Sequence, residues 1–191
     1  MINTYVLVYF LIACYFIIER LLRKGEQALS LQSGQPDCGS SRFLWATGLF
    51  NLFIIFLAPV LNSYYIGYCE NIYLGWFGLA LMIIGLIIRF WVAKTLGKFY
   101  TRTLQIIEDH YIVNQGLYRI IRHPGYLGTF LMDVGIGLAV TNWFVLVVIL
   151  LTGLIARVYR IIVEEEMLEA SLGEEYKTYR ETTWRFVPFI Y

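Results

Sequence analysis

Five long apolar runs dominate this sequence, and they restrict what the chain can fold into. A helix needs about 20 mainly apolar residues to cross roughly 30 Å of hydrocarbon. Of the 191 residues, 59% are apolar, which is not the composition of a soluble domain. The sequence therefore predicts an all-α integral membrane protein, a single polytopic domain over residues 1–191. About five transmembrane helices are expected, near residues 4–22, 43–61, 73–93, 124–140 and 143–163.

The basic residues predict the orientation of these helices, because Lys and Arg gather on the cytosolic side. Basic residues flank the first loop and are frequent in 94–123, whereas 62–72 carries neither Lys nor Arg. We therefore expect the N-terminus outside, and cytosolic catalytic segments at 94–123 and 164–191. The polar stretch 24–41 is expected to be a cytosolic loop. The first run has no preceding positive charge and no cleavage site, which favours an uncleaved anchor, and the short loops favour a microbial cell membrane.

Several function classes find no support in the composition. The net charge of +1 gives no reason to expect nucleic acid as a partner. Three separated cysteines, Cys14, Cys38 and Cys69, form no C-x-x-C pair and are expected to be free thiols. Only two histidines are present, so we expect no metal site. We treat the chain as a monomer, although no feature of the sequence fixes the oligomeric state.

A first motif, G-L-Y-R-I-I-R-H-P-G-Y over residues 116–126, stands where the fourth helix is expected to begin. Pro124 suits a first helical turn, which leaves His123 near the N-cap. The unpaired backbone N–H groups there form an anion site that the two arginines of the motif strengthen. Two small residues, Gly125 and Gly128, would let another backbone or a flat ligand approach closely.

A second motif, R-x-x-R-x-x-x-E over residues 157–164, lies near the end of a helical pattern that continues to about Leu172. At 1.5 Å per residue this helix is about 45 Å long, so its last turns must project beyond the hydrocarbon. Arg160 and Glu164 then lie on one helix face at the inner boundary. An ordinary surface ion pair is the structural alternative. Four other acidic residues are expected on a solvated face: Glu165, Glu166, Glu174 and Glu175.

Both motifs are expected at the same membrane level, because the fourth helix starts inside and the fifth returns there. This predicts a cytosol-facing pocket, formed by the C-terminal half, with a lipid-facing wall. Asp133 is expected near mid-membrane, where an ionisable group is costly and is a functional candidate. Its structural alternative is a buried bond to Arg89. The aromatic residues near the boundaries are expected to be interfacial anchors: Trp45, Tyr64, Tyr65, Tyr73, Trp76, Trp91 and Trp143.

Together with G-x-E-Y-x-x-Y over residues 173–179 and a late Pro188, these motifs resemble those of the isoprenylcysteine carboxyl methyltransferase family and its phospholipid methyltransferase relatives. The resemblance covers about residues 105–188. It implies S-adenosylmethionine as the cofactor, and the chain carries no glycine-rich dinucleotide fingerprint. It also implies a catalytic pair, Arg160 and Glu164, with Arg160 as the substrate contact. The implied cofactor contacts are Gln105, His110, Tyr111, Ile112, Val113, Tyr118, His123, Pro124, Gly125, Tyr126 and Glu164.

The resemblance implies a methyltransferase that acts, within the membrane lipids, on the carboxylate of a prenylcysteine-like lipidated substrate at the cytosolic interface. Such a carboxylate is ionised at neutral pH, so no general base is required. Arg160 would hold it in a two-point grip, and Glu164 would pair with the cofactor's ammonium. Two alternatives are open. A phospholipid N-methyltransferase would need a carboxylate or tyrosine base, and a non-catalytic scaffold would fail to bind the cofactor.

Overall fold

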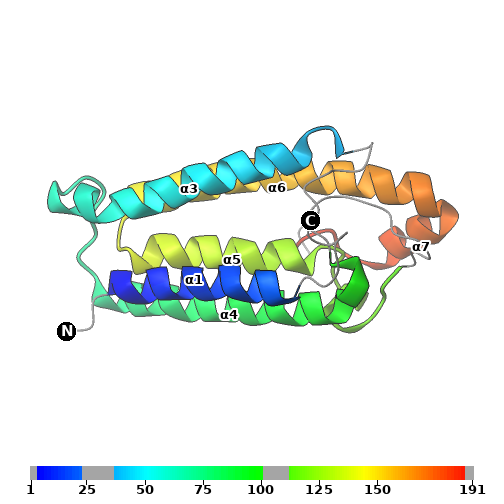
Figure 1. Ribbon diagram of the computed structural model, residues 1–191, viewed down its shortest axis with the longest axis horizontal. Helices are drawn as coiled ribbons and strands as arrows, with labels where there is room; N and C mark the ends of the chain where they lie inside the picture. Colours follow the sequence, from blue (N-terminus) through cyan, green and yellow to red (C-terminus); the bar gives the residue numbers. More distant parts are fainter. Residues whose placement is uncertain (1–3, 23–36, 101–111, 188–191) are drawn as a thin grey trace.

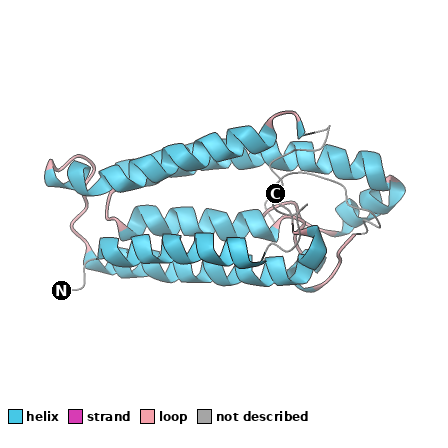
Figure 2. Cartoon of the chain, viewed as in Figure 1, coloured by secondary structure: helices cyan, strands magenta, loops and turns pink. Residues whose placement is uncertain are grey.

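We describe the chain from its computed structural model, which covers residues 4–22, 37–100 and 112–187 (Figure 1). Among these residues the regular structure is helical, with no strand (Figure 2). Three predicted cofactor contacts, Gln105, His110 and Tyr111, lie outside the described residues. In chain order the elements are α1 Thr4–Leu22, α3 Ser40–Ser63, α4 Ile72–Leu96, η2 Gly97–Phe99, η3 Gly116–Arg119, α5 Pro124–Ala139, α6 Trp143–Leu172 and α7 Glu174–Thr182.

Four of the helices, α1, α3, α4 and α6, are long and apolar enough to cross a membrane. The all-helical membrane fold is therefore confirmed. Helix α5 has 16 residues, which gives about 24 Å of rise and is short of the usual span. It nevertheless runs from one end of the bundle to the other beside α4 and α6 (Figure 1). A fifth crossing by α5 remains a prediction.

The chain reverses direction at the two ends of the bundle (Figure 1). At one end, the loop between α3 and α4 pairs with the link between α5 and α6, where Cys69 N–H donates to Thr141 O at 2.9 Å and Trp143 N–H to Gly67 O at 2.9 Å. The opposite end collects the start of α3, the ends of α1 and α4, the start of α5 and the last turns of α6. Both sequence motifs lie there, as the predicted hairpin of α5 and α6 requires.

Helices α4 and α5 form the closest helix pair, because glycines face each other across it. A Cβ at Gly85 would lie 2.4 Å from Gly128 O, and a Cβ at Gly78 would lie 2.5 Å from Gly135 O. On each helix the two glycines are seven residues apart and so lie on one face. Only residues without a Cβ permit this approach, which is a common way for helices to associate in lipid.

Buried ion pairs hold other helices to this pair. Arg89 on α4 donates from Nε to Glu19 Oε1 on α1 at 3.0 Å and from Nη1 to Gly125 O at 3.2 Å. The predicted bond between Asp133 and Arg89 is therefore wrong. Asp133 instead pairs with Arg157 on α6, where a glycine at 153 leaves room for both side chains. Sequence could place Asp133 at mid-membrane but could not show which helix it faces.

Large apolar side chains cover much of the outer surface of the bundle. The seven predicted anchor aromatics are all exposed, from 36% for Trp45 to 83% for Tyr73. The membrane offers an apolar surrounding for such a surface, which in water would be a liability. Their anchoring role remains a prediction. The three cysteines are free, as expected.

We expect Gly85→Val to destabilise the protein by about 1–3 kcal/mol, because the new side chain would overlap the backbone of α5. Thermal unfolding of the purified protein in detergent measures this. Gly48→Val on α3 is the matched control, since a Cβ there meets nothing within 4 Å. Equal stability of the two variants would contradict the close packing of α4 on α5.

Candidate functional site

A cavity of about 470 Å³ lies between the helices and reaches the end of the bundle that holds both motifs. This volume is in the usual range for small-molecule sites. One part of its wall is apolar and comes from α1 and α3, with Phe16, Leu49 and Ile55 among its residues. The other part is polar and comes mainly from α5, α6 and α7. The pocket was predicted from the C-terminal half alone, and the structure corrects this: α1, α3 and α4 also end or begin at this level and complete the wall.

Most of the described candidate residues line this cavity: Ile112, Val113, Tyr118, His123, Gly125, Tyr126, Arg160 and Glu164. Pro124 is fully buried at the first position of α5, after His123 at the N-cap, as the motif predicts. It does not appear in the cavity wall. The structure therefore brings the two motifs to one cavity, although they are separated by more than thirty residues in sequence.

Arg160 and Glu164 are joined through a tyrosine rather than by direct contact. Tyr126 on α5 donates its hydroxyl to Glu164 Oε2 at 2.7 Å and accepts from Arg160 Nε at 3.3 Å. Arg160 is only 4% exposed, so the surface ion pair considered from sequence is not what the structure contains. Among the described residues Glu164 makes no ion pair, which leaves its negative charge available to a cation in the cavity.

Three residues at the start of α3 also contact Arg160. Its Nη1 donates to Asp37 Oδ1 at 2.7 Å, to Ser40 Oγ at 2.9 Å and to Ser41 Oγ at 2.6 Å. The sequence predicted only a cytosolic loop over residues 24–41, so this contact was not expected. Asp37 lies 123 residues before Arg160, and no local pattern reports such a pairing.

Glu165 is buried and does not lie on the predicted solvated face. It is 4% exposed and binds two guanidinium groups and one imidazole: Arg122 Nε at 3.0 Å, Arg185 Nη2 at 2.8 Å and His123 Nε2 at 3.1 Å. The run of three glutamates suggested solvent, but the apolar residues Ile161 and Leu168 lie at helical spacing on either side of Glu165. That periodicity is the signal that would have indicated an inward face.

The C-terminal segment holds the first motif in place through its backbone. Arg122 N–H donates to Trp184 O at 2.8 Å, and Trp184 N–H donates to Ile120 O at 2.9 Å. His123 N–H then donates to Arg185 O at 3.2 Å. Glu165 binds side chains from both paired segments, Arg122 and His123 from the first motif and Arg185 from the C-terminal segment. The start of α5, where the anion site was predicted, is thus fixed from two directions.

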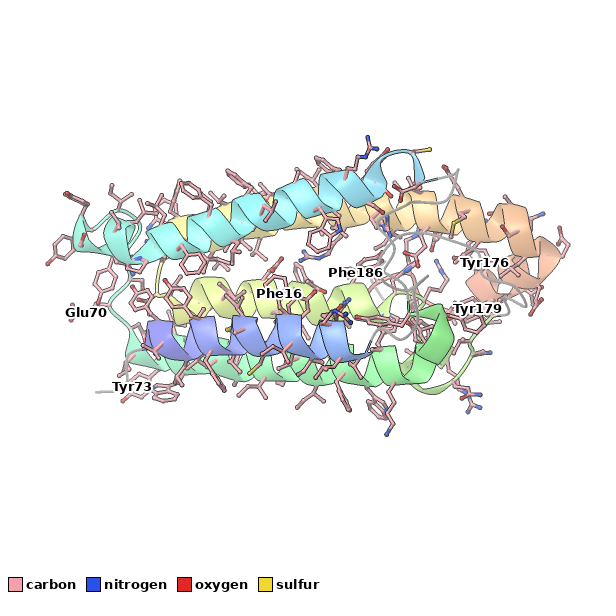
Figure 3. The ribbon with its side chains drawn as sticks, viewed as in Figure 1. Phe16, Glu70, Tyr73, Tyr176, Tyr179 and Phe186 are labelled. Carbon is pink, nitrogen blue, oxygen red and sulfur yellow. The ribbon has the colours of Figure 1, made fainter. Side chains whose placement is uncertain are left out.

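Tyrosines from η3 and α7 complete the polar wall. Figure 3 labels the two that come from α7, Tyr176 and Tyr179. Tyr179 donates its hydroxyl to Tyr118 O at 2.7 Å, whereas the buried Tyr176 hydroxyl has no hydrogen-bond partner among the described residues. Burial raises the pKa of Tyr118 and of Tyr176, and it raises the pKa of Tyr179 to about 12 against the opposing effect of Arg122. At neutral pH these phenols are hydrogen-bond donors rather than bases.

The fold and the cavity define the class of protein, an all-helical membrane protein with a small-molecule site at one end of its bundle. Among the described residues no group of three or more His, Cys, Asp or Glu could hold a metal ion. Charged and apolar side chains together line the cavity, so the candidate ligands are organic molecules with charged and apolar parts.

Comparisons with known proteins identify the family. A sequence model described as "Isoprenylcysteine carboxyl methyltransferase (ICMT) family" matches residues 78–170. A "Probable protein-S-isoprenylcysteine O-methyltransferase" of Oryza sativa subsp. indica is 33% identical over 138 residues, which cover 70% of this chain and 68% of that protein. The protein-S-isoprenylcysteine O-methyltransferase of Dictyostelium discoideum is 28% identical over 142 residues, 73% of this chain and 60% of that protein.

A solved structure, that of the eukaryotic intramembrane Ras methyltransferase ICMT, shares the fold. Its TM-score is 0.70 at 21% identity, and the match covers 93% of this chain and 62% of that chain. The chain thus spans roughly two thirds of the length of the proteins that it resembles. This chain belongs to the isoprenylcysteine carboxyl methyltransferase family, which places it among the carboxyl methyltransferases.

We expect Glu165→Ala to destabilise the protein by about 3–5 kcal/mol, because the buried Arg122 guanidinium loses its carboxylate and His123 and Arg185 lose the same partner. The C-terminal segment should also become sensitive to proteolysis before the rest of the chain. Thermal unfolding and limited proteolysis in detergent measure the two effects. Glu166→Ala, at an exposed neighbouring position, should change neither, and similar behaviour of the two variants would contradict the role given to Glu165.

Proposed function

We propose that the protein uses S-adenosylmethionine to methylate the carboxylate of a prenylcysteine-like lipidated substrate at the cytosolic face of the membrane. One observation supports this most directly. Arg160, the predicted substrate contact, places its buried cation in the same cavity as Glu164. The apolar wall of this cavity is formed by α1 and α3. Such a cavity suits a ligand with a carboxylate at one end and a hydrocarbon chain at the other.

The apolar wall fits the proposed prenyl chain. Phe16 of α1 is 48% exposed and Leu49 of α3 is 64% exposed, although both also line the cavity. Figure 3 shows Phe16 on the side of α1 that faces α3. The cavity therefore adjoins the outer apolar surface, which in the membrane is in contact with lipid. A prenyl chain lying there would stay in an apolar surrounding while its charged end reaches Arg160.

Arg160 is proposed to hold the substrate carboxylate and orient one of its oxygens for attack. The carboxylate is ionised at neutral pH, so no residue has to remove a proton. Catalysis then depends on position and on charge compensation by buried groups. The sequence predicted that Arg160 holds the carboxylate through two of its nitrogens, but Arg160 Nε and Nη1 already have partners in the structure. Nη2 makes no hydrogen bond among the described residues.

The residues of the polar wall fit S-adenosylmethionine. When bound, this cofactor supplies an electrophilic methyl group on a sulfonium. Glu164, a cavity carboxylate that makes no ion pair with any described residue, suits its ammonium. Tyr176 places in the same cavity a hydroxyl that finds no partner among the described residues, and a buried donor without a partner is costly unless a ligand satisfies it. The Nε2 edge of His123 is held by Glu165, and the backbone N–H groups of His123 and Tyr126 already donate to Arg185 O and His123 O. The start of α5 can therefore offer a cofactor carboxylate the Gly125 N–H and the other imidazole edge.

Methyl transfer from labelled S-adenosylmethionine tests the proposal with detergent-purified protein and a farnesylated cysteine analogue. We expect base-labile label on the analogue. Arg160→Gln should lower the rate at least about 100-fold, since a buried charged partner of the substrate is lost. Lys177→Gln, an exposed position on α7, is the matched control and should retain full activity.

Phosphatidylethanolamine is the second substrate in this assay. An amine must lose a proton before it reacts, and the raised pKa values of Tyr118 and Tyr179 make them poor bases at neutral pH. Glu164, the carboxylate in the same wall, is proposed to pair with the cofactor's ammonium instead. We therefore expect no base-stable label on the phospholipid. Such label, or full carboxyl methylation by Arg160→Gln, would contradict the assigned reaction.

Tyr176→Phe tests the cofactor site independently of the substrate. The hydroxyl has no hydrogen-bond partner in the part of the chain that the structure describes, so its removal should leave stability unchanged or slightly raised. If that hydroxyl binds the cofactor, affinity for S-adenosylmethionine should fall about fivefold to tenfold, as measured by isothermal titration calorimetry. Tyr179→Phe is the control: it loses a hydrogen bond to Tyr118 O, so its stability should fall. Unchanged affinity in Tyr176→Phe would remove this residue from the cofactor site.

A further inference from the structure

Arg160 is already paired with a carboxylate, that of Asp37 just before α3. The two side chains are 5% and 3% exposed, with Nη1 2.7 Å from Oδ1. Asp37 therefore occupies a position on the guanidinium that a substrate carboxylate would otherwise take. A carboxylate that binds Arg160 must either share the guanidinium with Asp37 or displace it.

Sharing is unfavourable on electrostatic grounds. Two carboxylates on one guanidinium would bring two negative charges together in a buried site, where they are weakly screened. Glu164 adds a third negative charge on the other side, joined to Arg160 through Tyr126. Displacement avoids this, because the substrate then replaces one anion at Arg160 by another.

Asp37 keeps other partners when Arg160 leaves it. Its Oδ1 accepts from the hydroxyls of Ser40 and Ser41 at 2.9 and 2.8 Å, and its Oδ2 accepts from Ser41 N–H at 3.2 Å. These donors satisfy the buried carboxylate oxygens without the guanidinium. Arg160 without Asp37 would need a replacement anion, and the substrate supplies it. The contact between Arg160 and Asp37 therefore allows a substrate carboxylate to take the place of Asp37 at Arg160.

We propose that Asp37 determines specificity by exchanging with the substrate carboxylate at Arg160; this inference rests on the function proposed above. Methylation converts that carboxylate to a neutral ester, which brings no charge to compete with Asp37. Asp37 then pairs with Arg160 again as the product leaves. The negative charge of Asp37 thus lets the site distinguish the substrate carboxylate from the product ester.

Equilibrium binding of a farnesylcysteine analogue and of its methyl ester, without methyl donor, tests the exchange on the full chain in detergent. Asp37→Asn keeps an acceptor for the serine hydroxyls and removes the charge. We expect the carboxylate to bind about tenfold tighter to this variant, because the competing anion is gone. The ester should change less than about twofold.

Ser41→Ala is the matched control, since it removes a neutral partner of both Arg160 and Asp37. If Asp37 only positions Arg160, both variants should bind the carboxylate more weakly. Equal or weaker carboxylate binding by Asp37→Asn would overturn the exchange. Asp37→Ser gives the same comparison with a smaller neutral side chain if the asparagine variant does not fold.

The methyl transfer assay separates this inference from the proposed function. Transfer to the cysteine analogue by the wild type, with no gain in carboxylate binding by Asp37→Asn, overturns the exchange alone. Absence of both methyl transfer and carboxylate binding in the folded wild type overturns the proposed substrate class, and the exchange fails with it.

Discussion

The glycine contact between α4 and α5 is the constraint on which the rest of the structure depends. Helices in lipid gain little from burying apolar surface against each other, so close backbone packing must supply much of their association. Gly78 and Gly85 bring α4 against Gly128 and Gly135, and this fixes the position of the short helix α5. Helix α5 in turn positions Tyr126 and the first motif opposite α6. A side chain at any of these four glycines would move the start of α5 and with it one wall of the cavity.

Charge compensation then completes the site. Arg89, Arg157, Arg160 and Arg122 are each paired with a carboxylate from another helix or segment. A buried charge without a partner is costly in the low dielectric of a bundle, and each pairing therefore links two elements. The sequence places many charges in apolar surroundings, and the structure shows that they join the helices around the cavity.

Local rules predicted the parts of this structure that depend on local physics. The apolar runs located α1, α3, α4 and α6, and the His-Pro pair located the start of α5, because span length and helix initiation are set within a few residues. The i, i+4 spacing placed Arg160 and Glu164 on one face. Partners were beyond such rules. Asp37 binds a residue 123 positions away, Glu19 one 70 positions away and Glu165 one 42 positions away. Helical periodicity reports a face but never the side chain opposite it.

The difference between Glu164 and Arg160 indicates how two charged ligands would be sorted in one cavity. Glu164 accepts a neutral tyrosine hydroxyl and has no cation among the described residues, so a cationic group finds an unshared partner there. Arg160 has an anion from its own chain, so an anionic group is bound only by exchange. A ligand with both a positive and a negative group gains most by placing its cation at Glu164. A ligand with only a negative group must rely on its apolar part for affinity while its anion exchanges with Asp37 at Arg160. The apolar wall from α1 and α3 provides that affinity, which is why the polar and apolar halves of the cavity have to adjoin.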